Sequence, residues 1–351
     1  QFLTFLCAVI KGVDEYADLL RISAASAAND HRLGANEAPP AIISIFMGEE
    51  LQGVLDALVS GDTYTSQSMT FKIGVDALPD FPKDSTDRNR TSPFAFTGNR
   101  FEFRMVGSSE NIACPNHMLN TIVASELSDI ADKMEKVPAD KFKDELKKLL
   151  AEIVKEHKRV IFNGDGYSDA WVEEAAKRGL PNYKTTADCV PHYADEKNVK
   201  LFEKFGIFSK AEIEARVEIL LESYSKTINI EALTMIDMAK KKYIPACLAY
   251  SKELADAIAV KKSIDVCSCV EKDLVKKVTD ETEKAYDAVQ KLEEVTAVAA
   301  AKTCMQEMAN AYRDTVLPVM DELRKAVDAL EVLLPSTMWP VPAYSEMIFN
   351  V

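Results

Sequence analysis

The stretch "RNRTSPFAFTGNRFEFR", residues 88–104, alternates bulky apolar residues with small, polar or charged ones on both sides of a Gly-Asn pair. A two-residue alternation is typical of β-strands, and Gly98-Asn99 is a signal for a two-residue turn. The stretch therefore predicts a β-hairpin with strands over residues 93–97 and 100–106.

The second predicted strand has one apolar face and one charged face. Phe101 and Phe103 alternate with Arg100, Glu102 and Arg104. Because successive side chains of a strand point to opposite sides, the three charged residues share one face over about 13 Å, at roughly 3.3 Å per residue. We call Arg100, Glu102 and Arg104 the charge ladder.

The charge ladder has two interpretations. On a solvated sheet face its ion pairs would need no ligand, and each would contribute at most about 1 kcal/mol. The four phenylalanines favour instead a central, well-packed hairpin with half-buried charges. Unpaired charge that is removed from water is costly, so such a ladder requires compensating ions. Phosphates, a substrate carboxylate and a divalent metal would supply them. The four phenylalanines are Phe94, Phe96, Phe101 and Phe103.

Composition limits the class of protein. The chain has 351 residues, of which 47% are hydrophobic and 28% charged, as in an ordinary globular protein with room for two cores. A net charge of -14 and a pI near 4.9 argue against a nucleic-acid partner. We see no signal peptide and no apolar run near the ~18 residues of a membrane span, so we expect no membrane partner. Seven scattered cysteines without CxxC spacing favour a reducing, cytoplasmic location.

Two further motifs favour structural interpretations. Cys267-Ser-Cys269 could hold a soft metal, but no second cysteine pair and no neighbouring His accompany it. Residues 163–174, "NGDGYSDAWVEE", resemble a calcium loop, yet Tyr167 and Ser168 occupy the positions of an acidic ligand and of the required Gly. We predict a turn and a helix N-cap there.

Hydrophobic periodicity predicts helices separated by short strands and loops in the first part of the chain. A capping box, Ser209 to Glu212, opens the last of these helices. We expect helices over 1–21, 48–58, 115–135, 141–157 and 209–225, a short buried strand over 41–47, an ordered loop over 29–40 and a long connection over 60–92.

Beyond this region the composition changes. Residues 231–334 contain no Gly and are rich in Ala, Glu, Lys, Leu and Val. This pattern predicts three long helices in an antiparallel bundle, kinked or divided at Pro245 and Pro318. Residues 335–351 are aromatic and Pro-rich, and we expect a non-helical tail that docks on the body of the protein.

Three motifs in order resemble glutamine synthetase. His31-Arg32-Leu33 to Glu37-Ala38-Pro39 is similar to the family's K-R-L to E-A-P loop, Asn89-Arg90-Thr91 to its N-R-S/T strand, and the charge ladder to its R-x-E-x-R strand. Residues 180–226 resemble the closing helices of its catalytic domain. The long helical extension makes the chain similar to the type III branch of the family.

The resemblance implies an α+β fold. Residues 1–230 would form the C-terminal half of the catalytic domain, with a curved antiparallel sheet flanked by helices. Residues 231–334 would be the helical bundle extension, and 335–351 the docking tail. The small N-terminal β-grasp domain and most metal-binding glutamates of the family have no counterpart here, so we expect the chain to be part of a longer protein.

The resemblance also implies a reaction. Glutamine synthetase makes γ-glutamyl phosphate from glutamate and ATP, and ammonia then displaces the phosphate. ATP and Mg²⁺ or Mn²⁺ are the implied cofactors. Arg90 and Arg100 would bind the ATP phosphates, and Glu102 would ligate the metal on the nucleotide side, which matches the charge that phosphoryl transfer demands. The family further implies a homo-oligomer, expected as a double ring of hexamers.

On the substrate side, Arg104 and Arg32 would hold glutamate, and Arg32 would also contact its phosphorylated carboxyl group. Glu37, in a flap over the site, would accept a proton from ammonium. Two departures from the family occur: the spacing from Arg32 to Glu37 is one residue shorter than usual, and a common second Arg is replaced by Ala95. Arg88 is a candidate substitute for that Arg.

Two other functions stay open. An ATP-grasp or guanidino-kinase-like phosphotransferase would also use an Arg/Glu ladder, but it would lack the E-A-P flap. A catalytically inactive relative could serve as a regulatory or oligomerisation subunit through its bundle. Retention of Glu102 and Arg104 favours an active enzyme.

Overall fold

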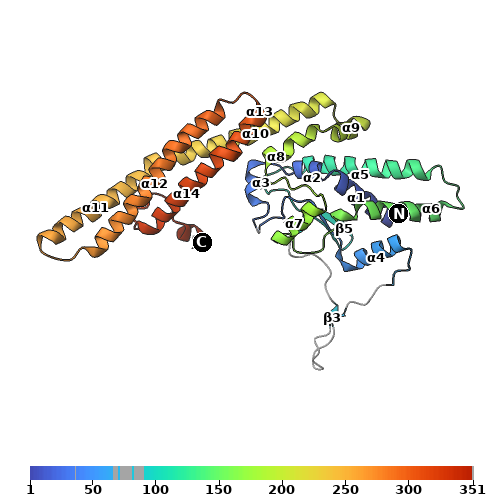
Figure 1. The fold of residues 1–351 in the computed structure, drawn as a ribbon, viewed down its shortest axis with the longest axis horizontal. Helices are drawn as coiled ribbons and strands as arrows, with labels where there is room; N and C mark the ends of the chain where they lie inside the picture. Colours follow the sequence, from blue (N-terminus) through green and yellow to red (C-terminus); the bar gives the residue numbers. More distant parts are fainter. Residues whose placement is uncertain (36, 66–69, 72–80, 83–90, 350–351) are drawn as a thin grey trace, which may run out of the picture. The chain divides into compact units, whose positions relative to one another are not determined.

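The computed structural model describes residues 1–35, 37–65, 70–71, 81–82 and 91–349. It divides into two compact units, Gln1–Leu220 and Leu221–Val351, which we describe separately. Helices dominate both units, and a small sheet lies in the first (Figure 1). Our domain boundary at residue 230 stays a prediction, and most of the predicted 60–92 connection, with Arg88 and Arg90, falls outside the described residues.

Two helices open the first unit. The predicted helix over 1–21 is present as α1 (Phe2–Glu15) and α2 (Ala17–Ile22), which are separated at Tyr16 because its backbone leaves the helical conformation. α1 packs on α5 (Ala113–Met134) and α6 (Phe142–His157). A Cβ at Gly12 would lie 2.5 Å from Cγ2 of Ile122, so a glycine allows this close approach of α1 and α5.

The sheet contains the predicted hairpin. β4 (Phe94–Thr97) and β5 (Arg100–Phe103) pair antiparallel across Gly98-Asn99, which confirms the hairpin. β1 (Ile45–Phe46) pairs with β4 in parallel, so the three-stranded sheet is mixed and not antiparallel throughout. Parallel pairing arises because β1 and β4 are joined by a connection that includes a helix, and such crossovers set strands parallel. A separate pair joins β2 (Thr70–Phe71) to β3 (Phe81–Pro82).

Short helices position the loops of the first unit. α3 (Ala27–Arg32) includes the first residues of the loop that we expected over 29–40, because the Ser26 hydroxyl caps this helix by accepting from the Asn29 amide. Ser168 caps α7 in the same way, confirming the turn and N-cap that we predicted in place of a calcium loop. The remaining elements of this unit are α3 (Ala27–Arg32), α4 (Gly48–Ser60), η1 (Lys158–Val160), α7 (Asp169–Lys177), α8 (Thr186–Cys189), η2 (Val190–Ala194) and α9 (Glu196–Lys204).

α10 (Lys210–Met238) begins at the predicted capping box and continues past its predicted end at Ser225 into the second unit. The Ser209 amide donates to Glu212 Oε2 (2.8 Å), and the Glu212 amide donates back to Ser209 Oγ (3.4 Å). The helix continues because residues 226–238 contain no Gly or Pro.

Long helices make up the second unit. α12 (Cys269–Ala300) packs against both α11 (Ile244–Ser263) and α14 (Leu317–Leu333), and α13 (Met305–Ala311) precedes α14 (Figure 1).

A π-helical turn precedes each of the two prolines at which we predicted kinked or divided helices. The turns are η3 (Ala239–Tyr243) before Pro245 and η4 (Tyr312–Val316) before Pro318. Proline clashes with the carbonyl one turn earlier, and the wider turn allows the helical path to continue. The prolines thus mark local widenings of the helices.

The C-terminal tail packs on helices of the second unit. Trp339 stacks on Tyr243 with ring centroids 5.1 Å apart, and the Tyr344 amide donates to Glu331 (3.0 Å). Our prediction of a non-helical tail is wrong for α15 (Tyr344–Phe349). This short helix forms after the last proline because Glu346 accepts a hydrogen bond from the Ala343 amide (3.0 Å) and so caps its first turn.

None of the helices in the described part of the chain has the length and apolar character that crossing a membrane requires. All seven cysteines are free, and Cys267 and Cys269 are exposed with their Sγ atoms 2.7 Å apart.

Candidate functional site

The hairpin register separates the apolar and charged faces. Phe94 lies opposite Phe103, and Phe96 opposite Phe101. Phe94 is 1% exposed, and its ring centroid lies 5.2 Å from that of Phe101. A slip of β5 by one residue would turn Phe101 and Phe103 to the opposite face, so packing of the aromatic face fixes the register and the orientation of the charge ladder.

Glu102 lies at the centre of the charged face. Its Oε1 accepts from Thr97 Oγ1 (2.8 Å) and Arg100 Nε (3.3 Å). Its Oε2 accepts from Nε and Nη2 of Arg104, at 3.1 and 2.9 Å. The hydrogen bond from Thr97, followed by that from Arg104, lowers the pKa of Glu102 below its ordinary value. The carboxylate is therefore ionised near neutral pH.

Exposure falls along the charge ladder. The side chains of Arg100, Glu102 and Arg104 are 75%, 32% and 15% exposed. The solvated interpretation thus fits Arg100, and the half-buried interpretation fits Arg104. One end of the ladder is open to water and the other is enclosed by protein.

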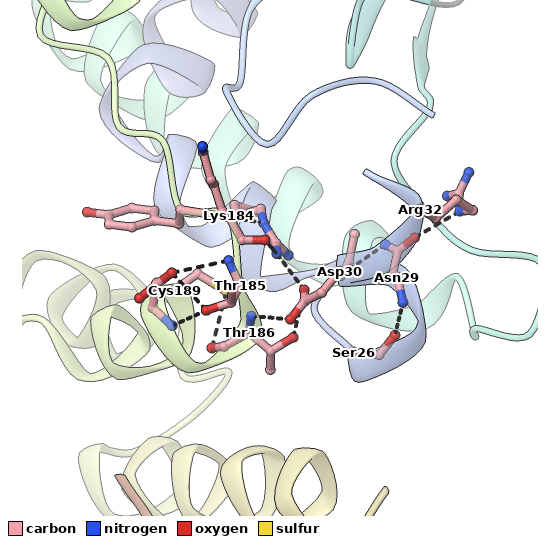
Figure 2. A network of polar contacts seen from close by, with 12 residues as sticks. Ser26, Asn29, Asp30, Arg32, Lys184, Thr185, Thr186 and Cys189 are labelled. Carbon is pink, nitrogen blue, oxygen red and sulfur yellow. Dashed lines mark hydrogen bonds and ion pairs between the residues drawn. The ribbon is translucent and has the colours of Figure 1, made fainter. Parts of the chain in front are cut away.

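Arg32 lies at the enclosed end. Its Nη2 donates to the carbonyl of Met105 (2.9 Å), the residue after Arg104, and its Nε donates to Asn29 Oδ1 (3.0 Å). Figure 2 shows Arg32 and Asn29 side by side at the end of α3. Arg32 and the ladder come from segments about 70 residues apart, so only the fold brings them together.

The loop after Arg32 closes tightly. The Gly34 amide donates to the carbonyls of Ala38 (3.2 Å) and Pro39 (3.1 Å), and Gly34 has a φ of 76° that favours glycine. Glu37 is exposed in this loop. Within the described residues, no hydrogen bond or ion pair links Glu37 to the ladder.

A buried network holds the other side of α3. Asp30 accepts from Arg21 Nη2 (2.8 Å), from the Thr186 amide (2.6 Å) and from Thr186 Oγ1 (3.0 Å). Arg21 is fully buried and also donates to the carbonyls of Tyr183 (2.8 Å) and Lys184 (3.2 Å). We call Arg21, Asp30 and Thr186 the buried network, of which Figure 2 labels Asp30 and Thr186.

Burial has the largest effect on the pKa of Asp30 in this network. Desolvation raises the pKa of Asp30, although Arg21 and Thr186 act in the opposite direction. The network joins α2, α3 and α8, so it fixes the helix from which Arg32 extends.

A sequence profile described as the glutamine synthetase C-terminal domain matches residues 145–262. The whole chain is 46% identical to a glutamine synthetase of Butyrivibrio fibrisolvens, of which it covers 50%. The resemblance of the chain to glutamine synthetase is thus confirmed. Over 99% of its length it is also 41% identical to a type-3 glutamine synthetase of Dictyostelium discoideum and 38% identical to a glutamine synthetase of Bacteroides fragilis. The chain spans about half the length of these relatives.

The hairpin register shows where Ala95 lies, one of the two departures from the glutamine synthetase pattern. Ala95 lies directly opposite Glu102 and is fully buried. A small side chain therefore stands beside the carboxylate, where the resemblance led us to expect a second Arg. Arg88, the candidate substitute, lies outside the described residues.

The resemblance implies a divalent metal, and we compare its needs with the described residues. Among the described residues, no group of three or more His, Cys, Asp or Glu side chains could hold a metal ion. Glu102 supplies one ionised, partly exposed carboxylate, which suits Mg²⁺ or Mn²⁺. Since Mg²⁺ takes six oxygen ligands and keeps several waters, Glu102 fits as one ligand of a larger set.

Sequence reasoning missed several residues of this site. Thr97 shares the ladder face by simple alternation, so period two could have identified it as a Glu102 partner. Asn29 and Asp30 lie in a segment that we expected to be a loop. Arg21 and Thr186 are 165 positions apart along the chain, and no local pattern indicates that they share a partner.

Proposed function

We propose that this chain forms the phosphate-binding and glutamate-binding side of a glutamine synthetase active site. The reaction would ligate ammonia to L-glutamate with ATP through γ-glutamyl phosphate. The observation that carries the proposal is an ionised Glu102 between two arginines, with Arg32 bound at the enclosed end of the same strand.

The first step would join two anions. An oxygen of the glutamate γ-carboxylate attacks the γ-phosphorus of ATP, and ADP leaves. Arg100, open to solvent, and Arg90, outside the described residues, would bind the ATP phosphates. Positive charge fixed in advance at these oxygens lowers the barrier without reorganisation.

Glu102 would hold the divalent metal on the nucleotide side. When bound, such an ion would neutralise part of the negative charge of the phosphates. The donors from Thr97, Arg100 and Arg104 keep Glu102 ionised and fix the direction of its oxygens.

Arg104 and Arg32 would bind the carboxylates of glutamate. Ammonia then attacks the carbonyl carbon of γ-glutamyl phosphate, and phosphate leaves. Glu37 would remove a proton from ammonium before this attack. Its exposure in the loop after Arg32 is compatible with a flap that closes when substrate binds. We also keep a homo-oligomeric ring as part of the proposal.

Replacement of Glu102 by alanine tests the proposal. In the complete protein, Glu102→Ala should reduce glutamine synthesis from glutamate, ammonia and ATP by at least about 10³-fold, because an electrostatic partner of the transferred group is lost. The fold should be retained, since Glu102 lies at the surface side of the hairpin.

Glu174→Ala is the matched control. Glu174 is also a partly exposed carboxylate paired with an arginine, Arg178, in the same unit. It should leave turnover within about twofold of wild type, as surface substitutions away from a site usually do. Near-normal turnover of Glu102→Ala at saturating magnesium would contradict the proposal, and so would an inactive wild-type protein.

A further inference from the structure

Asn29 uses every hydrogen-bonding group of its side chain. It is 2% exposed. Its Nδ2 donates to the carbonyls of Ala24 (2.6 Å) and Met105 (2.9 Å), and its Oδ1 accepts from Arg32 Nε (3.0 Å). A buried amide with its donors and its acceptor engaged is held in a single orientation.

Asn29 and Arg32 meet at the same oxygen. Both Asn29 Nδ2 and Arg32 Nη2 donate to the carbonyl of Met105, each at 2.9 Å. With the bond between Asn29 and Arg32, these contacts form a closed ring of three residues (Figure 2 shows its Asn29–Arg32 side). The ring ties the end of α3 to the segment that follows the charge ladder.

The ring determines which edge of Arg32 faces a ligand. A guanidinium has five N–H groups, one on Nε and two on each Nη. Nε and one N–H of Nη2 are bound to protein oxygens. The remaining N–H groups, on Nη1 and Nη2, point along the end of the side chain, and these two nitrogens match the two oxygens of a carboxylate.

We propose that Asn29 is a positioning residue that holds Arg32 with its Nη1–Nη2 edge directed at the carboxylate of the amino-acid substrate. The identity of this ligand as L-glutamate rests on the proposed function. Asn29 does not touch the substrate. It acts through Arg32, because a small rotation of the guanidinium would break the paired geometry that a planar carboxylate needs.

If Asn29 had only a structural role, its loss would lower stability without a specific effect on glutamate binding. Asn198 offers a matched comparison in the same unit: it is fully buried, and its Nδ2 donates to Asp18 Oδ2 (2.8 Å) and to the carbonyl of His192 (2.7 Å). Neither of these two hydrogen bonds involves Arg32. Loss of either amide removes two buried donors, so both alanine variants should lose stability to a similar degree.

The experiment measures L-glutamate binding to the complete protein by calorimetry, together with the KM values for glutamate and ATP. Asn29→Ala should weaken glutamate binding and raise its KM about tenfold, because the guanidinium is no longer fixed, with less than about a twofold change in the KM for ATP. Asn198→Ala should change neither KM by more than about twofold. Should Asn29→Ala fail to fold, Asn29→Ser replaces it, because its single hydroxyl keeps a polar group at the site but cannot make all three contacts of the amide, so the same change in the KM for glutamate is expected.

A double-mutant cycle with Arg32→Ala identifies the route of the effect. If Asn29 acts through Arg32, Asn29→Ala should add less than about twofold to the loss that Arg32→Ala causes alone. Multiplying losses would overturn the inference, as would an unchanged glutamate affinity in Asn29→Ala or an equal loss in Asn198→Ala.

Failure of the proposed function has a separate signature. A wild-type protein that does not bind L-glutamate, or an Arg32→Ala variant that binds it normally, would overturn the assignment of the ligand and the inference with it. Normal binding by Asn29→Ala beside weakened binding by Arg32→Ala would overturn only the role of Asn29.

Discussion

The charge ladder and the buried network pair the same chemical groups with opposite results. Each joins an arginine to a carboxylate at 2.9 Å or less. Glu102, one-third exposed, has its pKa lowered by its donors, whereas Asp30, 10% exposed, has its pKa raised by desolvation. Solvent access therefore decides whether attraction or desolvation determines the pKa. It also separates an arrangement that a ligand can reach from one that only protein atoms contact.

The largest expected effect comes from breaking the buried network. Arg21→Ala would leave Asp30 buried without its ion pair and two carbonyls without their donor. Removal of one partner of such a pair should lower the free energy of unfolding by about 3–5 kcal/mol. Arg100→Ala, on the open end of the ladder, should lower it by less than about 1 kcal/mol. Urea unfolding of both variants checks this, and equal losses would contradict the distinction.

A smaller effect is expected within the charge ladder itself. Arg104→Lys keeps the charge but removes the fork that gives Glu102 two hydrogen bonds. Because we propose that Arg104 binds glutamate, the KM of Arg104→Lys for glutamate should rise about tenfold, and more than its KM for ATP. Arg100→Lys should show the reverse order. The opposite pattern in either variant would exchange their assignments, and steady-state kinetics with each substrate varied in turn measures both.

The same two regions show how far sequence reasoning reaches. The hairpin followed from alternation and a Gly-Asn turn, since both are local, and the three charged residues on one face followed from the pleat. The helices over 2–22 and 142–157 followed from three- and four-residue periodicity. The break between α1 and α2 did not follow, because no Gly or Pro stands at Tyr16. At Pro245 and Pro318 the prolines predicted an interruption of the helix, but not its form as a π turn.

Long-range partners were beyond any local pattern. The Met105 carbonyl accepts a hydrogen bond from Arg32, and the Thr186 amide donates one to Asp30. Both are backbone groups, so no side-chain motif in the sequence indicates these contacts. The parallel pairing of β1 depends on how the chain returns to the sheet. Arg90 and Arg88 stay predictions from the resemblance, and the role of Glu37 rests on it as well.

The smallest expected effect concerns pH, and its sign differs between the two regions. The folded pKa of Glu102 lies below its ordinary value of 4.5. Its contribution to stability is therefore present above pH 4.5 and is lost as the pH falls through the folded pKa. The folded pKa of Asp30 lies above its ordinary value of 3.8. Between pH 3.8 and the folded pKa of Asp30, the folded state binds more protons than the unfolded state. The contribution of Asp30 to stability therefore falls as the pH rises.

Opposite changes in slope should follow when each group is made unable to titrate. From about pH 6 to about pH 3, the free energy of unfolding of Glu102→Gln should fall less steeply than that of wild type. Asp30→Asn should fall more steeply, because the compensating gain on acidification is gone. Urea midpoints at half-unit pH steps would measure both slopes, with Glu174→Gln as a control for an exposed carboxylate. If both variants changed the slope in the same direction, desolvation would dominate at both carboxylates or at neither. Solvent access would then not separate the charge ladder from the buried network.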